Sequence, residues 1–222
     1  MKKIFFVLLA SFVFVSVQAV QAAVLFTDLG TAAPPATVST YTLIPFDQAP
    51  QAAIADSTDV TTIPGCPVPG TLTTGASVNK RTIGSGWATW SHGYTGVVYM
   101  GGSEIVLNLP PDTQAFYFYA EPDSFSTMVI SAETDSGASS GDINVTGASG
   151  ANGFAFYTNA GESITTITVA TNDTFMAIGE FGIAQAAEPA AIPTMNEWGL
   201  IILSLLVAGS AIFVIKQKKT AC

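Results

Sequence analysis

The run Ala115-Phe116-Tyr117-Phe118-Tyr119-Ala120, followed by Glu121-Pro122, is the strongest indication of how this chain folds. Consecutive aromatic residues that end near a proline are typical of a strand. Side chains alternate along a strand, so Phe116 and Phe118 lie on one face. Tyr117 and Tyr119 lie on the other. One of the two faces must belong to a hydrophobic core.

Similar runs of β-branched and aromatic residues recur about every ten residues, separated by Gly, Asn, Asp and Ser. No long stretch has the period of a helix. The pattern predicts an all-β sandwich or jelly roll over residues 23–184. The expected strands are 24–26, 40–44, 87–90, 96–100, 104–109, 115–120, 125–132, 143–146, 154–158, 164–170 and 175–183.

Between residues 38 and 85 the content of Pro, Thr, Gly and Ala rises and the strand period fades. This composition predicts long loops that decorate one side of the sandwich, not a second domain. Residues 185–191, rich in Ala with one Pro, are expected to be a short linker.

Residues 1–22 have the pattern of a secretory signal peptide. Two lysines precede an apolar run from Ile4 to Val17, which is too short to span a membrane well. Small residues allow cleavage after Ala19 or Ala22, and Ala22 is favoured. The body of the protein is therefore expected to be exported.

The exported part is strongly acidic. Lys80 and Arg81 are its only basic residues between positions 23 and 191, against fifteen Asp and Glu, which gives a formal charge of −13. Such a surface repels nucleic acid and anionic lipid headgroups, and it lacks the basic stripe of a nucleic-acid-binding protein. Nucleic acid is excluded as a partner.

A second apolar segment lies near the C-terminus. From Trp198 to Ile215 there are 18 residues without a formal charge, followed by Lys216, Lys218 and Lys219. At about 1.5 Å per residue, a helix of this length spans roughly 27 Å, enough to cross a bilayer. The lysines place the tail in the cytoplasm and the body outside. We therefore expect a transmembrane helix over residues 198–215.

A short motif leads into this segment. Pro193 disfavours a helical conformation at Ile192, so this part should be extended, as a substrate is in a protease cleft. Trp198 is an aromatic anchor at the membrane interface. The motif residues are Ile192, Pro193, Thr194, Met195, Trp198 and Gly199.

Residues 192–222 closely resemble the sorting signal of the IPTL-CTERM family, which combines an Ile-Pro-Thr-Leu-x-x-Trp-Gly motif, a transmembrane helix and a basic cluster. Met195 stands where the family usually has Leu. The resemblance implies a substrate of an exosortase, a membrane-embedded cysteine transpeptidase-like enzyme, and not an enzyme. It also implies an anchored inner-membrane precursor that ends at the cell surface or outside the cell. An ordinary C-terminal anchor is the alternative.

A weaker resemblance involves the body itself. Residues 86–96, which read Gly-Trp-Ala-Thr-Trp-Ser-His-Gly-Tyr-Thr-Gly, and residues 115–122 look like parts of the β-rich ectodomains of other exosortase-sorted surface proteins. This likeness implies a fold and a location but no activity.

Catalysis has few candidate residues. His92 is the only histidine, so a Ser-His-Asp or Cys-His device would have to use it. A packing or turn position is the better interpretation, given its aromatic and glycine neighbours. Glu121 and Asp123 resemble the carboxylate pair of a glycosidase, but two close acids are expected by chance in so acidic a chain. We predict no catalytic residue.

Aromatic residues form a candidate ligand face. Exposed rings stack well on sugars and other partners, although core packing explains most such residues. The candidate face consists of Trp87, Trp90, Tyr94, Tyr117 and Tyr119.

Two further features concern metal and thiol chemistry. Residues 133–137, with Asp142 and Asn144, offer oxygen ligands to a structural calcium ion, but solvated loops are the default, and we expect no cofactor. Cys66 lies in a loop of Pro and Gly, and Cys222 is expected on the other side of the membrane. No disulfide within the body is therefore expected.

Taken together, these features predict an exported surface or extracellular-matrix protein of structural or adhesive type. Its expected partners are an exosortase-type enzyme, the membrane and surface glycans. The competing hypotheses are a carbohydrate-binding module and a surface hydrolase.

Overall fold

The computed structural model describes residues 23–159, 161–186 and 202–206. The chain divides into two compact units, residues 1–186 and 187–222. The predicted signal peptide lies outside the described residues, as does most of the predicted span 198–215. Within that span, residues 202–206 are helical. Across the described ranges, no helix is both long enough and apolar enough to cross a membrane.

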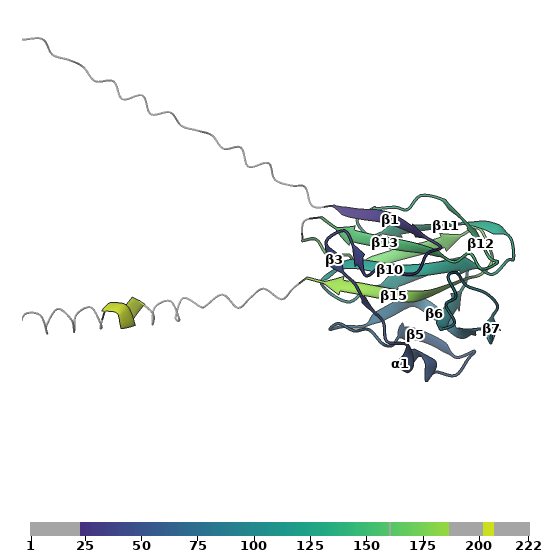
Figure 1. Cartoon of the computed structure of the whole chain (residues 1–222), viewed down its shortest axis with the longest axis horizontal. Coiled ribbons are helices and arrows are strands. Elements are labelled where there is room, and N and C mark those ends of the chain that lie inside the picture. Colours follow the sequence, from purple (N-terminus) through teal and green to yellow (C-terminus); the bar gives the residue numbers. More distant parts are fainter. Residues whose placement is uncertain (1–22, 160, 187–201, 207–222) are drawn as a thin grey trace, which may run out of the picture. The chain divides into compact units, whose positions relative to one another are not determined.

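The first unit is a β-rich body whose strands almost all join one sheet (Figure 1). Its strands are β1 (Val24–Gly30), β4 (Ile44–Pro45), β5 (Asp59–Ile63), β6 (Leu72–Ile83), β7 (Gly86–Trp87), β8 (Val97–Gly101), β9 (Glu104–Asn108), β10 (Thr113–Pro122), β11 (Thr127–Thr134), β12 (Ile143–Thr146), β13 (Asn152–Thr158), β14 (Thr166–Thr171) and β15 (Met176–Gln185). The hydrogen-bonded order is β1-β13-β10-β15-β8-β6-β9-β14-β11-β12. Strand β4 also pairs with β15, and β5 and β7 pair with β6.

Three small elements accompany the sheet: β2 (Thr37–Val38), β3 (Tyr41–Thr42) and the helix α1 (Gln48–Ala52). Strands β2 and β3 pair only with each other. Asp47 caps α1, because its Oδ1 accepts a hydrogen bond of 3.0 Å from the backbone N–H of Ala49.

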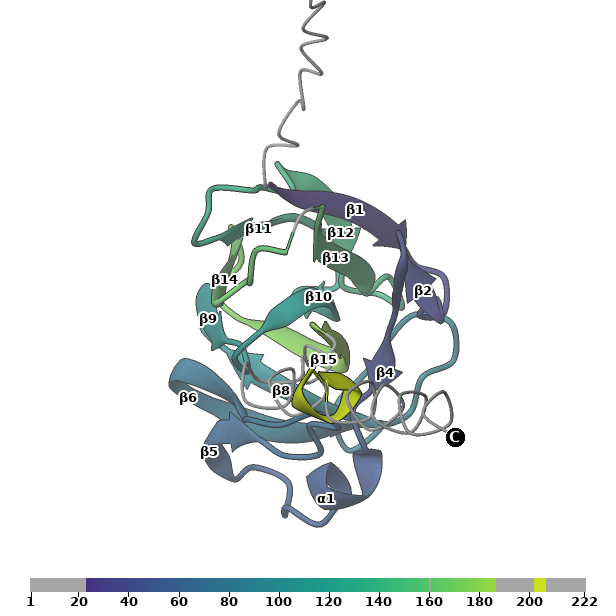
Figure 2. The ribbon, with the colours of Figure 1, turned by 90° about the vertical axis from the view of Figure 1, so that its left-hand side faces the viewer.

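The sheet curls so strongly that its own strands face each other across one core. Figure 2 shows β9, β14 and β11 on one side of this core and β13, β10 and β15 on the other. Phe118 of β10, Leu107 of β9 and Val169 of β14 are fully buried in the same cluster. Phe118 also stacks on Phe154 of β13, with ring centroids 5.3 Å apart. This continuous apolar inner face is the main stabilising feature of the body.

Strand β10 is buried on both faces. Phe116 and Phe118 belong to the core, whereas Tyr117 and Tyr119 belong to a second cluster on the outer face of the sheet. Residues 34–46 and 83–94 contribute to this second cluster, and we call them the outer layer. The outer-layer side chains in the cluster are Val38, Leu43, Trp87 and Trp90, with Tyr41, Ile83 and Tyr94 packed against it.

The predicted all-β class is confirmed, and the strands pair antiparallel except for the short parallel pair β6–β7. A sandwich would divide the strands between two separate sheets. Here the backbone hydrogen bonding runs without a break from β1 to β12, so the two facing halves belong to one curled sheet.

The prediction of decorating loops over residues 38–85 is wrong for β5 and β6, which belong to the sheet. Strand β6 lies in the middle of the sheet, paired with β8 and β9, and β5 pairs with it in turn. The polar composition of β6 does not show the apolar pattern expected of a strand in the middle of a sheet. Lys80, for example, is 3 % exposed, and its Nζ lies 2.6 Å from Oδ1 of Asp56.

Other predicted strands differ from the structure in their bounds. Residues 87–90 contribute only Trp87 to a strand, because the rest belongs to the outer layer. Residues 40–44 divide between β3 and β4. Strand β15 extends to Gln185, which was expected in the linker. The Nε2 of Gln185 donates to the carbonyl oxygens of Pro69 and Pro111, so this residue is part of the body.

Candidate functional site

The outer layer is fastened to the sheet through a buried carboxylate, that of Glu121 on β10. The indole Nε1–H of Trp87 donates to Glu121 Oε2 over 2.7 Å. The backbone N–H of Gly150 donates to Oε1 over 3.1 Å, and the hydroxyl of Thr89 lies 3.3 Å from the same atom. Burial raises the pKa of Glu121, and these donors act in the opposite direction.

A second, largely buried carboxylate, that of Glu180, is turned to the outer face by a β-bulge. Strands β10 and β15 shift register between Tyr119↔Gly179 and Tyr117↔Gly182. The bulge interrupts the alternation of β15, so Phe181 packs in the core while Glu180 points outward. Glu180 has a positive φ of 50°, a strained conformation for a residue with a Cβ.

Glu180 receives two hydrogen bonds from the outer layer. The indole Nε1–H of Trp90 donates to Oε2 over 2.7 Å, and Nε2 of His92 lies 2.9 Å from Oε1. The Glu180 side chain is 9 % exposed. Burial raises the pKa of this carboxyl, although the bonds from His92 and Trp90 favour its ionised form. Glu180 is not among the site residues predicted from the sequence. Its position as the one acidic residue in the otherwise apolar predicted strand 175–183 is the signal that could have identified it.

Ser91, His92 and Glu180 are connected in a row. Oγ of Ser91 lies 2.9 Å from Nδ1 of His92, whose Nε2 faces Glu180. The connectivity resembles that of a hydrolase triad. Ser91 is only 1 % exposed, however, so its hydroxyl is out of reach of a substrate in this conformation. The row fixes the position of the outer layer.

The five residues of the candidate ligand face do gather on one side of the sheet. Four of them are nevertheless covered, because Trp87, Trp90, Tyr117 and Tyr119 are at most 6 % exposed. Tyr94 is half-buried. The four covered rings therefore pack inside the body and do not form an exposed ligand face.

Glycines on the neighbouring strands accommodate two of the rings. The ring of Tyr117 lies over Gly182, and that of Tyr119 lies over Gly153, in space that a Cβ would fill. Each tyrosine is paired with its glycine across the strands. The side chains of these two tyrosines can therefore lie close against the sheet.

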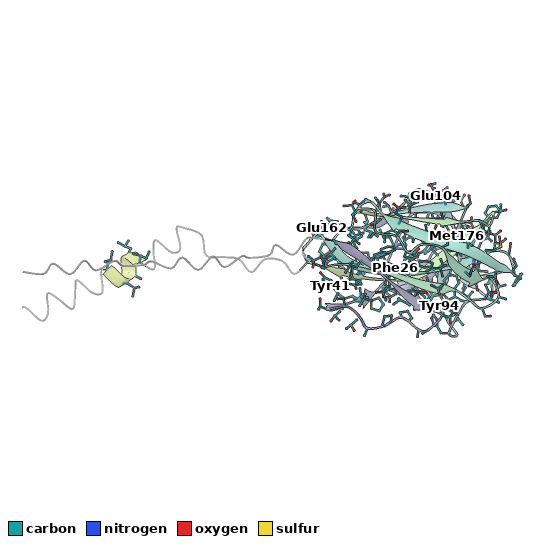
Figure 3. All side chains as sticks on the ribbon, turned by 90° about the horizontal axis from the view of Figure 1, so that it is seen from above. Phe26, Tyr41, Tyr94, Glu104, Glu162 and Met176 are labelled. Atoms are coloured by element: carbon teal, nitrogen blue, oxygen red, sulfur yellow. The ribbon has the colours of Figure 1, made fainter. Side chains whose placement is uncertain are left out.

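A cleft of about 450 Å³ opens beside Glu180, between the outer layer and the sheet. Burial, followed by the charge of Glu180, raises the pKa of Tyr117 in its wall to about 12, so this phenol stays protonated. Figure 3 shows Tyr94, another wall residue, and Glu104 toward opposite edges of the body. The cleft is lined by Pro34, Pro35, Ala36, Leu43, Pro45, Phe46, Gln48, Tyr94, Tyr117, Glu180 and Phe181.

The residues suggested for calcium are not brought together. Asn144 lies opposite Val129 in the β11–β12 hairpin, whereas Asp135 follows the far end of β11. Asp135 already accepts hydrogen bonds from Thr165. In the part of the chain that the structure describes, no group of three His, Cys, Asp or Glu is placed to hold a metal ion.

Cys66 is a free, half-buried thiol. Its side chain packs against the core, and its Sγ lies 3.6 Å from the carbonyl oxygen of Val68. Burial raises the pKa of the thiol, which lowers the fraction of reactive thiolate.

The buried carboxyl of Glu121 should make the stability of the protein depend on pH. The pKa of Glu121 is raised in the folded protein. Below the unfolded-state pKa of about 4.3, the carboxyl is therefore protonated in both the folded and the unfolded protein. Above that pH the unfolded chain ionises first, and the contribution of Glu121 to stability is lost as the pH rises through its folded pKa. We expect the free energy of unfolding of the wild type, relative to Glu121→Gln, to fall as the pH rises above about 4.3. Urea titrations of both proteins measure this difference, and a value independent of pH would contradict the prediction.

The comparisons with known proteins concern the C-terminal segment. Residues 190–213 match the IPTL-CTERM motif, which confirms the resemblance found in the sequence. This motif implies an exosortase-type C-terminal sorting signal of an exported surface protein. No curated protein matches the chain. The motif residues 192–199 and the lysines at 216, 218 and 219 lie outside the described residues.

Proposed function

We propose that this protein is a structural or adhesive component of the cell surface or extracellular matrix, delivered by export and processed by an exosortase. The observation that carries the proposal is the match of residues 190–213 to the sorting motif. In the proposed pathway, the signal peptide directs export and the segment 198–215 holds the precursor in the inner membrane. The enzyme then acts within the motif.

The architecture of the body supports an adhesive role. Thr113 of β10 pairs with Gln185 at one end of the strand pair, and Pro122 pairs with Met176 at the other. The chain therefore leaves the body at the end opposite to the loops 123–126 and 172–175. Ten residues of β10 separate the two ends by roughly 30 Å.

Two phenylalanines are displayed at this far end. Phe125 is 69 % exposed and Phe175 is 43 % exposed. Their loops are joined, since the backbone N–H of Asp123 donates to the carbonyl oxygen of Phe175 over 3.1 Å, and Asp173 accepts from Ser124. The two loops are held together by hydrogen bonds and lie at the end of the body opposite to Gln185. Exposed aromatic side chains in such loops are suited to contact with another surface.

The alternative functions have less support. A carbohydrate-binding module would need accessible rings, and most of the candidate face is covered. A surface hydrolase would need an accessible nucleophile near His92, and Ser91 is buried. We therefore propose that the protein is not an enzyme.

Processing of the C-terminus is the direct test of the sorting proposal. Intact-mass spectrometry of the protein from a host with its exosortase is expected to show a chain cut between residues 192 and 199. Trp198→Ala should leave most of the product uncut, because the enzyme loses an interfacial anchor of its substrate. Glu197→Gln, at a variable position of the motif, is the matched control and should be processed normally. A wild-type product that retains its tail through Cys222 would contradict the proposal.

A further inference from the structure

The cleft beside Glu180 has the composition of a ligand site. Its walls are mostly apolar, with three prolines and two phenylalanines, and its polar groups are few. A concave, largely apolar pocket that contains a small number of fixed polar groups is the usual form of a small-molecule site. Its volume of about 450 Å³ falls within the range of roughly 300–1,000 Å³ typical of such sites.

The carboxyl of Glu180 is the only acidic group in the lining of this cleft. Nε2 of His92 lies 2.9 Å from Oε1 of Glu180. Nδ1 of the same ring lies 2.9 Å from Oγ of Ser91 and 3.3 Å from the carbonyl oxygen of Thr31. The hydrogen bonds from His92 and Trp90 favour the ionised form of Glu180, which is the source of negative charge in the cleft lining. Trp90 supplies a second donor, which leaves further lone pairs of the carboxylate without a partner among the described residues.

Aromatic rings complete the electrostatic character of the site. Tyr94 lines the cleft as a half-buried ring, whereas Tyr117 and Phe46, each 3 % exposed, line it with only a small part of their surface. The faces of such rings carry negative potential and attract cations, most strongly where water is excluded. The formal charge of −13 over residues 23–191 also raises the local concentration of cations.

The apolar walls decide which kind of cation fits. A small inorganic ion would have to exchange its hydration shell for prolines and aromatic rings, which offer few oxygen ligands. A sugar would need many hydrogen-bonding partners, and the hydroxyl of Tyr94 is already directed to Gln48 and to the carbonyl oxygen of Val97. A cation with apolar substituents satisfies both the walls and the charge.

We propose that this cleft binds a small organic cation, an alkylated ammonium group whose charge contacts Glu180 and whose substituents pack on Tyr94, Tyr117 and the prolines. The bulge in β15 places the carboxylate at the cleft, and the outer layer forms the cover. Binding at this site does not depend on C-terminal processing, so either proposal can fail without the other.

Titration of the full-length, ¹⁵N-labelled chain in nonionic detergent tests the proposal. The probes are choline and its neutral isostere 3,3-dimethyl-1-butanol, used at about pH 8, well above the ordinary pKa of a carboxyl group. We expect choline to shift the indole N–H signal of Trp90 but not that of Trp87, whose partner is Glu121. The neutral isostere should bind at least about tenfold more weakly, because it lacks the charge.

Variants separate the site from general charge effects. Glu180→Gln removes the charge but keeps an acceptor for Trp90, and should reduce choline affinity to that of the isostere. Glu104→Gln removes an exposed charge outside the cleft and should change nothing. If Glu180→Gln fails to fold, Ala36→Phe narrows the cleft at an exposed position and should also abolish binding. Equal affinities for the two probes, no shift of the Trp90 signal, or unchanged binding in both cleft variants would overturn the proposal.

Discussion

Phe118→Ala is expected to lower the free energy of unfolding by about 3–5 kcal/mol. Phe118 is fully buried, and its ring stacks on that of Phe154 with centroids 5.3 Å apart and an interplanar angle of 7°. The ring centroids of Phe118 and Phe116 are 6.3 Å apart. Truncation leaves a cavity between the two facing halves of the curled sheet. Close-packed strands on both sides can collapse only partly into this space. Urea denaturation followed by fluorescence measures the change.

Phe125→Ala is the matched control, since it removes the same atoms from a side chain that is 69 % exposed. We expect its effect on the free energy of unfolding to stay within about 0.5 kcal/mol. Similar losses for the two variants would contradict the placement of Phe118 in the core. A selective effect of Phe125→Ala on surface adhesion would in turn support a role for the far end of the body.

Gly182→Ala is expected to destabilise the body by about 1–3 kcal/mol and to close the cleft. A Cβ at this position would overlap the ring of Tyr117, which is 3 % exposed and has little free space on the sheet side. The ring must therefore move toward the cleft that it lines. The predicted outcome is a lower urea midpoint together with weaker choline binding.

Gly102→Ala provides the comparison, because a Cβ there meets nothing within 4 Å. It should leave the urea midpoint nearly unchanged. A double-mutant cycle identifies the cause of the loss at position 182: in a Tyr117→Ala background, Gly182→Ala should cost less than in the wild type. Equal costs in the two backgrounds would show that the ring of Tyr117 is not the group displaced.

Much of the strand pattern follows from local sequence. The strand predicted over 143–146 has the bounds of β12, and the one predicted over 104–109 exceeds β9 by one residue. Phe116 and Phe118 share one face of β10, as predicted, and that face belongs to the core. These features depend on the period of a strand and on nearby turn residues, which neighbouring positions in the chain specify.

Strand β6 shows where local sequence is insufficient. Its place in the sheet depends on pairing with β8 and β9, which are separate in the sequence, and its polar residues give no clear alternation. Lys80 is acceptable there because Asp56 neutralises it at a buried position. No window of a few residues contains both partners, so hydropathy alone predicts a loop.

The sequence alone determined that the body is β-rich and acidic and that its C-terminus carries a sorting motif, because composition, period and short motifs are local properties. Only the tertiary structure decided that one sheet curls on itself and that both faces of β10 are covered. It also decided that a bulge turns Glu180 toward a cleft walled by the outer layer. These features arise from contacts between residues that are far apart in the chain, and such contacts have no local signature.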